Sequence, residues 1–222
     1  MTFAPLHVPT FSDILGELRR GKSLWRSLFN THLKAYPLKG KVIDLGAKST
    51  QASYYRFFDF TQAEMSFADL TPAPGVHVVD LEKPLPFADG AYDGAILANT
   101  VAYIYNLREL CRELRRVCRG EVIIISPFTQ PCVPEPADYF RCTEQGFERL
   151  LREAGFTEID ITLVGKSPIL AAVDAIEVVL RINNTLRLLS IAIAWGIDKG
   201  LRRFSRRYRE LPVCLGHIVR AR

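Results

Sequence analysis

Short apolar runs alternate along the chain with segments in which apolar residues recur every three or four positions. Seven runs have the length and composition of strands: residues 41–47, 64–69, 76–80, 92–97, 122–126, 156–164 and 213–219. Helical spacing occurs in 12–34, which Gly21 divides, and in 51–58, 107–117 and 143–155. Pro37 and Gly40 mark the approach to the first strand, and Gly120 and Gly155 mark the ends of two helices. The alternation predicts an α/β fold with a parallel sheet and crossover helices.

Three of the predicted strands end on, or directly precede, a carboxylate. Asp44 lies near the end of the first strand, Asp69 at the end of the second and Asp80 at the end of the third. The carboxyl ends of parallel strands meet at one edge of the sheet, where open α/β sheets bind nucleotide-like ligands. Carboxylates suit the hydroxyls of a ribose and the polar edge of an adenine better than they suit a phosphate. We therefore expect a nucleoside-containing ligand at this edge.

Residues 168–212 form the least expected part of the chain, because they separate the last two predicted strands by a long helical insertion. Asn183 and Asn184 divide it into two predicted helices. The second helix carries an apolar stripe at a spacing of three or four: Leu189, Ile193, Ile197, Leu201, Phe204 and Tyr208. Its longest uncharged run, 188–197, would span about 15 Å as a helix, half the thickness of a bilayer core. We expect that it does not cross a membrane.

A basic cluster follows that run and accounts for the net charge of the chain. It consists of Lys199, Arg202, Arg203, Arg206, Arg207 and Arg209. The chain has 29 basic and 24 acidic residues, so 23 basic residues remain without these six and the net charge of +5 disappears. Residues 184–209 could lie on an anionic membrane surface, where each basic residue adds about 1 kcal/mol. The alternative is a helix that packs on the domain or forms a homodimer interface; the few interleaved aromatic residues argue against nucleic acid.

The composition is that of an ordinary globular protein, with 48% hydrophobic and 24% charged residues. A chain of 222 residues has room for one domain with an appendage, and we divide it into an N-terminal helical segment, 1–36, and a domain, 37–222, that contains the insertion. Five cysteines without a Cys-x-x-Cys pair are typical of reduced thiols in a cytosolic protein, and no metal site is predicted. The N-terminus lacks the features of a secretory signal. We expect a cytoplasmic protein, peripheral at the inner membrane face if the insertion binds lipid.

Several segments together carry a family resemblance. The segment 42–46, the acids Asp69 and Asp80 with Leu81, and the segment 85–97 resemble motifs of class I S-adenosylmethionine (SAM)-dependent methyltransferases of the type 11 group. Three further segments resemble members found in polysaccharide and envelope-glycan pathways: 121–128, 138–143 and 146–156. The resemblance covers residues from about 38 to 165 and a last strand near 213–222. It implies a Rossmann-like fold: a mostly parallel seven-stranded sheet with an antiparallel last strand, helices on both faces, and the insertion before that strand.

The resemblance also implies roles for residues at the sheet edge. Asp44 would anchor the turn after the first strand or reach the amino group of SAM, and Gly46 would let the methionine part approach the backbone. Asp69 would accept hydrogen bonds from the ribose hydroxyls, and Asp80 from the adenine amine, with Leu81 against the ring. For the three acids, the alternative role is capping of the loops. The predicted cofactor set is Asp44, Gly46, Ala47, Lys48, Asp69, Leu70, Asp80, Leu81, Ala98 and Asn99.

The chain departs from the family pattern at three places. Lys48 stands where the first motif has a second glycine, and it could contact the cofactor carboxylate, narrow the pocket or be a solvated loop lysine. Ala102 and Tyr103 replace a Glu-His pair that relatives often have after the fourth strand. A Pro-x-His is also missing near Val133. The obvious histidine bases of this resemblance are therefore absent.

Polar residues on the acceptor side must then supply any catalytic group. The residues that remain there are Tyr103, Tyr105, Asp138, Tyr139 and Arg141. We name Tyr103, Asp138 and Arg141 as the catalytic candidates: Asp138 could act as a general base, and Arg141 could clamp a carboxylate or phosphate. The alternative is a mutual Asp138–Arg141 ion pair that fixes the loop. His77 and His217 lie inside predicted strands, which fits a core or edge position better than catalysis.

Three functions remain open. The first is a SAM-dependent methyltransferase that acts on a sugar hydroxyl or on another small-molecule or lipid-linked acceptor. The second is a methyltransferase-like binding or scaffold protein without catalysis, which Lys48 and the missing histidines favour. The third is another nucleotide-binding α/β enzyme, such as a dehydrogenase. The absence of Gly-x-Gly-x-x-Gly argues against the third, because a pyrophosphate needs that glycine-lined helix start.

Overall fold

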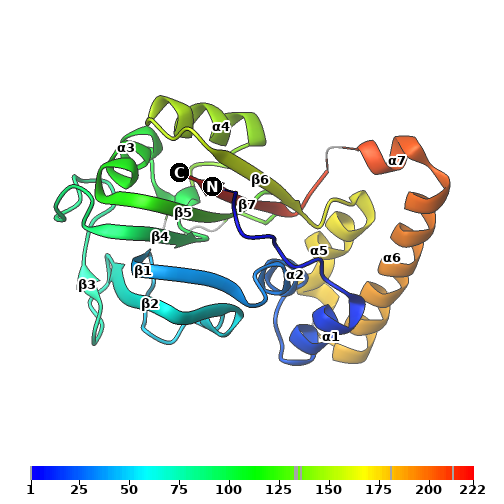
Figure 1. Ribbon diagram of the computed structural model, residues 1–222. Helices are drawn as coiled ribbons and strands as arrows, with labels where there is room; N and C mark the ends of the chain where they lie inside the picture. Colours follow the sequence, from blue (N-terminus) through cyan, green and yellow to red (C-terminus); the bar gives the residue numbers. More distant parts are fainter. Residues whose placement is uncertain (1, 133–134, 136, 181, 212) are drawn as a thin grey trace.

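A seven-stranded sheet forms the centre of the protein (Figure 1). The computed structural model describes residues 2–132, 135, 137–180, 182–211 and 213–222. The strands are β1 (Tyr36–Leu45), β2 (Phe58–Asp69), β3 (His77–Val78), β4 (Tyr92–Ala98), β5 (Cys118–Pro127), β6 (Ile159–Val164) and β7 (Gly216–Ala221). Their order is β3-β2-β1-β4-β5-β7-β6, and β7 runs antiparallel to both of its neighbours. The predicted fold, a mostly parallel sheet with an antiparallel last strand, is confirmed.

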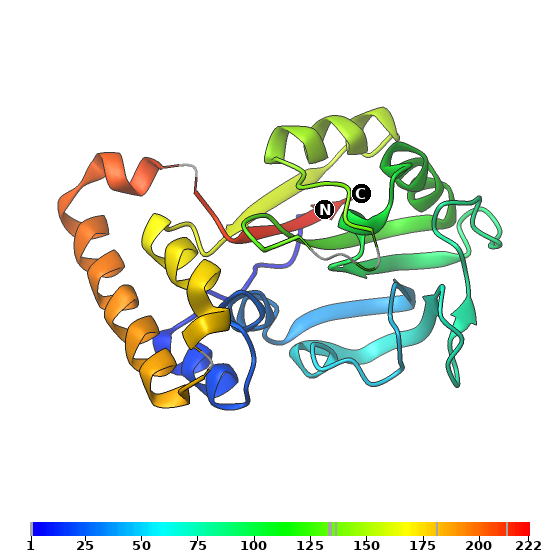
Figure 2. The ribbon, with the colours of Figure 1, turned by 180° about the vertical axis from the view of Figure 1, so that it is seen from behind.

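Helices cover both faces of the sheet, as the opposite views in Figures 1 and 2 show. On one face α3 (Leu107–Val117) and α4 (Glu144–Glu153) pack over a buried cluster that includes Leu97 of β4. On the other face α2 (Leu24–His32) packs over a second cluster that includes the preceding residue, Ile96. Successive residues of a strand point to opposite faces, so an uninterrupted apolar run such as this one fills both clusters.

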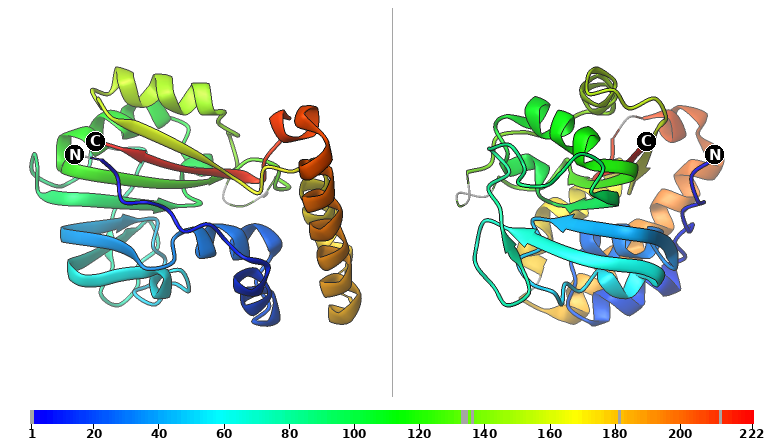
Figure 3. Two further views of the ribbon diagram at one scale, coloured as in Figure 1. Left: turned by 45° about the vertical axis from the view of Figure 1, so that its right-hand side comes forward. Right: turned by 60° about the vertical axis from the view of Figure 1, so that its left-hand side comes forward.

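A group of helices stands at one end of the sheet (Figures 1 and 3). It consists of α1 (Phe11–Arg19), α5 (Pro168–Leu180), α6 (Asn184–Phe204) and α7 (Arg206–Glu210). The predicted division of the insertion is confirmed, because the Asn183 side chain caps α6 by accepting from the N–H groups of Thr185 and Leu186. Val133, near the missing histidine motif, and Arg181 and Pro212 of the insertion lie outside the described residues. Among the described residues, no helix combines the length and the apolar character needed to cross a bilayer.

Two predictions around the first strand were wrong in part. The segment 51–58 contains only the 3-10 turn η1 (Tyr55–Phe57) instead of a helix, and its tyrosines turn inward toward β1. β1 begins at Tyr36 and runs through both residues that were expected to precede it. A shift of register next to Pro37 and a φ of 71° at Gly40 let the strand accommodate them.

Gly120 does not end a helix, as its position had predicted. α3 ends at Val117, and β5 begins with the next residue and continues through Gly120. A Cβ at this position would lie 2.2 Å from the carbonyl oxygen of Asp93 on β4. The glycine is therefore required by the close approach of two neighbouring strands rather than by a helix terminus.

Candidate cofactor and acceptor site

The parallel register brings the ends of three strands to one edge of the sheet. Asp44 of β1 lies opposite Phe67 of β2 and Ile96 of β4, and each strand ends one or two residues after this row. The loop after β3 joins the same edge, because the Val79 N–H donates to the carbonyl oxygen of Asp69 at 2.9 Å. The predicted cofactor residues on β1, β2 and β4 and in the loops that follow therefore gather in one place.

Asp44 is fully buried at this edge and is only half satisfied. One carboxylate oxygen, Oδ2, accepts from the hydroxyls of Tyr54 and, at 2.7 Å, of Tyr55. The other, Oδ1, is buried and has no hydrogen-bond partner among the described residues. Burial raises the pKa of Asp44 to about 6, and the nearby charge of Asp69 adds to this effect. A buried, unpartnered carboxylate oxygen is costly unless a ligand donates to it.

Gly46 adopts a conformation that other residues rarely take, with φ at 92°. Its N–H and that of Ala47 both donate to the carbonyl oxygen of Ala68, at 2.7 and 3.1 Å, which fixes the turn after β1. A Cβ on Gly46 would lie 2.3 Å from the Thr100 Oγ1. The packing of Thr100 against this turn already explains the glycine, and the predicted approach of a ligand to Gly46 stays a prediction.

Lys48 occupies a backbone conformation typical of glycine, with φ at 42°. Its side chain is exposed, and its N–H donates to Asp69 Oδ2 at 3.1 Å. The second glycine of the family motif would take this conformation without strain, so the chain keeps the shape of the motif although the residue has changed. The exposed side chain agrees with the interpretation of Lys48 as a loop lysine, although a contact with a ligand remains open.

Asp69 organises the loops on either side of it. Its Oδ2 accepts from the Lys48 N–H, and its Oδ1 accepts from the Thr71 N–H at 2.8 Å. This is the loop capping considered as its alternative role, yet each carboxylate oxygen keeps a second lone pair for a hydroxyl. Leu70 follows with two thirds of its surface exposed, on the solvent side of the same edge.

Asp80 lies farther out than Asp44 and Asp69. It accepts from the Glu82 N–H at 3.0 Å and pairs with the exposed Lys83 at 3.0 Å. Lys83 holds the pKa of Asp80 below its usual value. Leu81 beside it is buried in the core under α3, so only a small part of its side chain can reach a ligand.

Ala98 ends β4 at the same edge, and Asn99 follows it. Asn99 has a φ of 57°, and its N–H donates to the carbonyl oxygen of Ile125 at 2.8 Å. Its side-chain oxygen accepts from Trp25 Nε1 at 3.3 Å, so α2 reaches the predicted site. The strained backbone at Asn99 is held by contacts on both sides of it, as is typical of residues that line a binding site.

The acceptor-side candidates lie in the next turn and in the loop that packs on it. Tyr103 ends η2 (Val101–Tyr103), and the Tyr139 N–H donates to the carbonyl oxygen of Ala102 at 2.8 Å. Arg141 and the nearly buried Asp138 form a two-pronged ion pair, with one N–O distance of 2.6 Å. Burial raises the pKa of Tyr103, and the charge of Asp138 adds to this. The arrangement is the mutual pair that we considered as the alternative to catalysis.

The comparison with protein families gives a match over the part of the chain that builds this edge. Residues 43–126, from β1 to β5, match a family model described as a methyltransferase domain. Residues 43–126 of the chain thus match a methyltransferase domain. The match supports the predicted family and, with it, the predictions of an enzyme and of SAM as its cofactor. A search of curated proteins finds no match.

Solved structures share the fold of this methyltransferase at low sequence identity. The [4+2]-cyclase SpnF is 14% identical, with 99% of this chain and 98% of that chain covered and a TM-score of 0.53. A SAM-dependent methyltransferase from Thermotoga maritima is 14% identical (95% and 97% covered, TM-score 0.50). A complex from Haloferax volcanii that contains the Trm112 methyltransferase activator is 17% identical (69% and 79% covered, TM-score 0.51). These likenesses establish the fold, and the cyclase shows that the fold does not fix the reaction.

Sequence reasoning missed four side chains of the methyltransferase edge. They are Trp25, Tyr54, Tyr55 and Thr100. The adjacent tyrosines follow the acidic end of β1 by ten and eleven residues, and the helix predicted there would have pointed them in different directions. A pair of hydroxyl-bearing aromatics next to an acidic strand end was the available signal, since a buried carboxylate needs donors.

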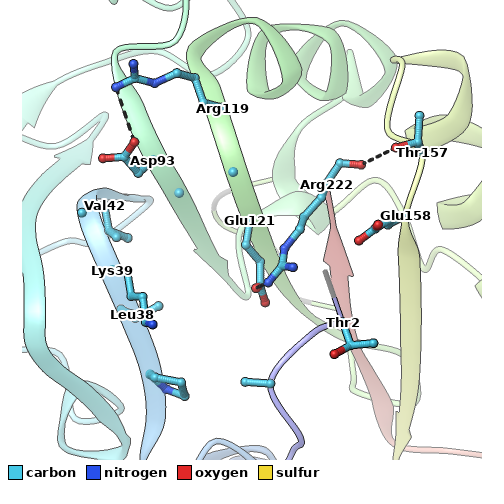
Figure 4. A pocket seen from close by; sticks show the side chains of 15 residues that line it. Thr2, Leu38, Lys39, Val42, Asp93, Arg119, Glu121, Thr157, Glu158 and Arg222 are labelled. Carbon is cyan, nitrogen blue, oxygen red and sulfur yellow. Dashed lines mark hydrogen bonds and ion pairs between the residues drawn. The ribbon is translucent and has the colours of Figure 1, made fainter.

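A separate pocket of about 1070 Å³ lies at the opposite edge of the sheet (Figure 4). Its walls come from the amino ends of β1, β4 and β5, where Arg119 pairs with Asp93 at 3.4 Å and Arg222 with Glu121 at 2.6 Å. None of the predicted site residues lines it. It is therefore distinct from the candidate site.

His217 is buried beside Phe128 and Phe147, as its position in a strand had predicted. Burial lowers its pKa to about 4, so the ring is neutral at physiological pH. His77 lies on the exposed strand β3. In the sheet register His77 pairs with Ala68, the residue before Asp69, and His217 pairs with Ser126 near the carboxyl end of β5.

Proposed function

We propose that the chain transfers a methyl group from SAM to a small-molecule, sugar or lipid-linked acceptor. The observation that carries this proposal is the buried Asp44 with one unpartnered oxygen, placed at the carboxyl edge of a sheet with methyltransferase topology. A buried carboxylate of this kind fits a ligand that brings a positive charge.

The residues at this edge fit SAM in three respects. Asp44 Oδ1 would accept from the ammonium group of the methionine part. Asp69 has lone pairs left for the ribose hydroxyls, and Asp80 would exchange the exposed Lys83 for the adenine amine. When bound, SAM supplies a methyl group that its sulfonium already activates, so the chain's own task is to bind, orient and exclude water.

An exposed aromatic cluster beside η2 supports a ring-shaped or partly apolar acceptor. Tyr105 lies 5.4 Å from Tyr139 and 6.0 Å from Phe140 between ring centroids, and all three side chains are exposed. Aromatic faces of this kind pack against sugar rings and apolar chains, while the tyrosine hydroxyls hydrogen-bond polar groups. Tyr139 and Phe140 lie in the same loop as the Asp138–Arg141 pair, and Tyr105 follows Tyr103 by two residues, so an acceptor bound there would be close to Tyr103.

A binding or scaffold protein without catalysis is the second candidate, and one observation favours it. Both oxygens of Asp138 accept from Arg141, so a substrate proton would have to displace the guanidinium before this carboxylate could act as a base. A reaction whose acceptor is already a good nucleophile would not need such a base. Acceptor turnover therefore separates the two candidates.

The first test is calorimetric titration of the protein with SAM and with its demethylated product. Asp69→Ala should weaken binding at least tenfold without loss of the fold. Asp59→Ala is the matched control, because Asp59 lies at the other end of β2 and accepts from the Thr61 N–H at 2.9 Å just as Asp69 accepts from Thr71. Binding that is equal in the two variants would remove Asp69 from the site, and no binding by the folded wild-type protein would contradict the proposed cofactor.

A further inference from the structure

The helix α6 buries charged side chains and exposes a row of apolar ones. Its buried positions include Arg187 and Asp198, which are 3% and 8% exposed. Arg187 pairs with the buried Glu177 of α5 at 2.7 Å, and Asp198 accepts from Arg202 at 2.7 Å and from the Tyr208 hydroxyl at 2.9 Å. Charged side chains thus hold this helix to the protein together with the buried apolar residues Ile191 and Ala194.

α5 also buries charged side chains. Its two acidic residues face inward, where Asp174 accepts from the Trp25 N–H at 3.1 Å and Glu177 accepts from the Leu24 N–H at 2.8 Å. Both acids thereby bind the first turn of α2, where a negative charge is favourable. Ile176 of α5, in contrast, is more than half exposed. The α5–α6 hairpin therefore buries acidic groups together with apolar ones such as Leu170 and Ile191, and it leaves a second set of apolar side chains exposed to solvent.

The outward apolar residues form a continuous line along α6, at intervals of three or four positions. This stripe consists of Leu186, Leu189, Ile193, Ile197, Leu201 and Phe204, with exposures between 39% and 85%. Ile182 before the helix and Ile176 and Val179 of α5 extend it. α6 is at the outer margin of the molecule (Figure 3, left), where nothing in the described chain covers this stripe. An exposed line of this length marks a surface that meets an apolar partner.

The charge around the stripe is positive, and the acidic residues of the same segment balance only part of it. Lys199 and Arg203 of α6 and Arg207 of α7 are exposed beside its C-terminal half. Between residues 182 and 211 the acidic residues are Asp198, which is buried, and Glu210, which pairs with Arg206 at 2.8 Å. A partner of this surface must therefore supply both apolar area and negative charge.

We propose that the stripe and the basic residues beside it bind the surface of an anionic lipid bilayer, with α6 lying in the plane of the interface. Acyl chains would take up the apolar side chains and anionic head groups would meet the arginines. A second copy of the chain fits less well. Packing two stripes together would bring the exposed basic residues of both copies together, because the acidic residues of the facing segment are the buried Asp198 and Glu210, which already pairs with Arg206.

The test is co-sedimentation of the full chain with phosphatidylcholine vesicles, with and without phosphatidylglycerol. We expect sedimentation with the anionic vesicles, which added salt weakens, and little with the neutral ones. A double change, Arg203→Ser with Arg207→Ser, should lower the partition coefficient about 30-fold, since each basic residue near such a surface contributes about fivefold. A second variant, Ile193→Ser with Ile197→Ser, should lower it at least tenfold. These positions are exposed, so the fold should survive.

Matched controls come from other faces of the chain. Arg149→Ser with Arg152→Ser removes two exposed arginines from α4, and Val8→Ser with Val78→Ser removes two exposed apolar side chains. Neither pair should change sedimentation by more than about twofold, since neither lies near the stripe. Equal losses in the controls and the stripe variants would overturn the assignment of this surface.

Two other outcomes would also overturn the proposal. Absence of sedimentation by the wild-type protein contradicts it directly. A dimer in sedimentation equilibrium that Ile193→Ser with Ile197→Ser converts to a monomer would assign the stripe to a second copy instead. SAM titration of the same variants keeps the two proposals separate: cofactor affinity should be unchanged in every stripe variant, whether or not lipid binding is found.

Discussion

Because Asp44 is buried, we predict that its ionised carboxylate lowers the free energy of unfolding of this protein. A carboxyl group whose pKa is about 6 in the folded protein and 3.8 in the unfolded chain binds its proton more tightly when folded. The folded state then holds more protons between these two values, so stability falls as the pH rises from about 4 to about 6. At about 1.4 kcal/mol per pKa unit, the loss from this one group is about 3 kcal/mol.

The perturbation that isolates this cost is Asp44→Asn, which keeps the size of the side chain and removes its charge. The amide oxygen can still accept from Tyr54 and Tyr55, while the amide nitrogen takes the place of the unpartnered oxygen and costs about 1–3 kcal/mol at every pH. Near pH 4 the variant should therefore be less stable than the wild type. Near pH 8 it should be about as stable or more so, because the wild type has by then lost about 3 kcal/mol.

The assay is urea unfolding of both proteins from about pH 4 to about pH 8, with the difference between their unfolding free energies plotted against pH. The difference is needed because acids such as Glu17, whose pKa Arg56 and Asn30 lower despite its burial, give the wild type a pH dependence of opposite sign. Asp59→Asn is the control: its pKa is lowered by the Thr61 N–H, so its difference should be small and of opposite sign. A difference for Asp44→Asn that stays constant across this range would refute the reasoning.

Three further predictions concern the same edge. If only ionised Asp44 binds the ammonium group of SAM, the affinity at about pH 5 should be about tenfold lower than at about pH 7.5, which calorimetry at the two pH values measures. Lys48→Gly should raise the unfolding free energy by about 1 kcal/mol, because glycine takes the positive φ without strain, whereas Ser49→Gly should lower it. Gly46→Ala should lower it by about 3 kcal/mol or more, and adding Thr100→Ala should restore part of the loss; the absence of any recovery would show that Thr100 is not the obstacle.

The sheet and its acidic edge could be predicted from the sequence because both depend on short-range pattern. α3 was predicted with its observed bounds, since its apolar residues recur at three and four positions and are all buried. The acids at the ends of β1 and β2 came to one edge because parallel register permits no other arrangement. The residues at the end of a strand can therefore be named from their positions in the sequence.

The details of the loops could not be predicted in this way. The inward turn of Tyr54 and Tyr55 depends on the burial of Asp44, which is a property of the packed sheet. The bond from the Leu24 N–H to Glu177 joins residues 153 positions apart, and no local pattern indicates it. The stripe on α6 was visible in the sequence, but helical spacing alone cannot tell a buried face from an exposed one.

Buried polar contacts help to determine which face of α6 is exposed. They also connect the proposed methyltransferase site with the proposed membrane-binding surface. Asp174 accepts from the first turn of α2 and from Gln130, which lies in the loop after β5 at the carboxyl edge. Trp25, in the same turn of α2, donates to Asn99 of the candidate site. Because these groups, together with buried apolar residues such as Ile191, fix the inner side of the hairpin to the edge with the candidate site, the apolar stripe faces away from it. A bilayer bound by the stripe would then contact the outer side of the hairpin, whose inner side is joined to the candidate site through Asp174 and Trp25.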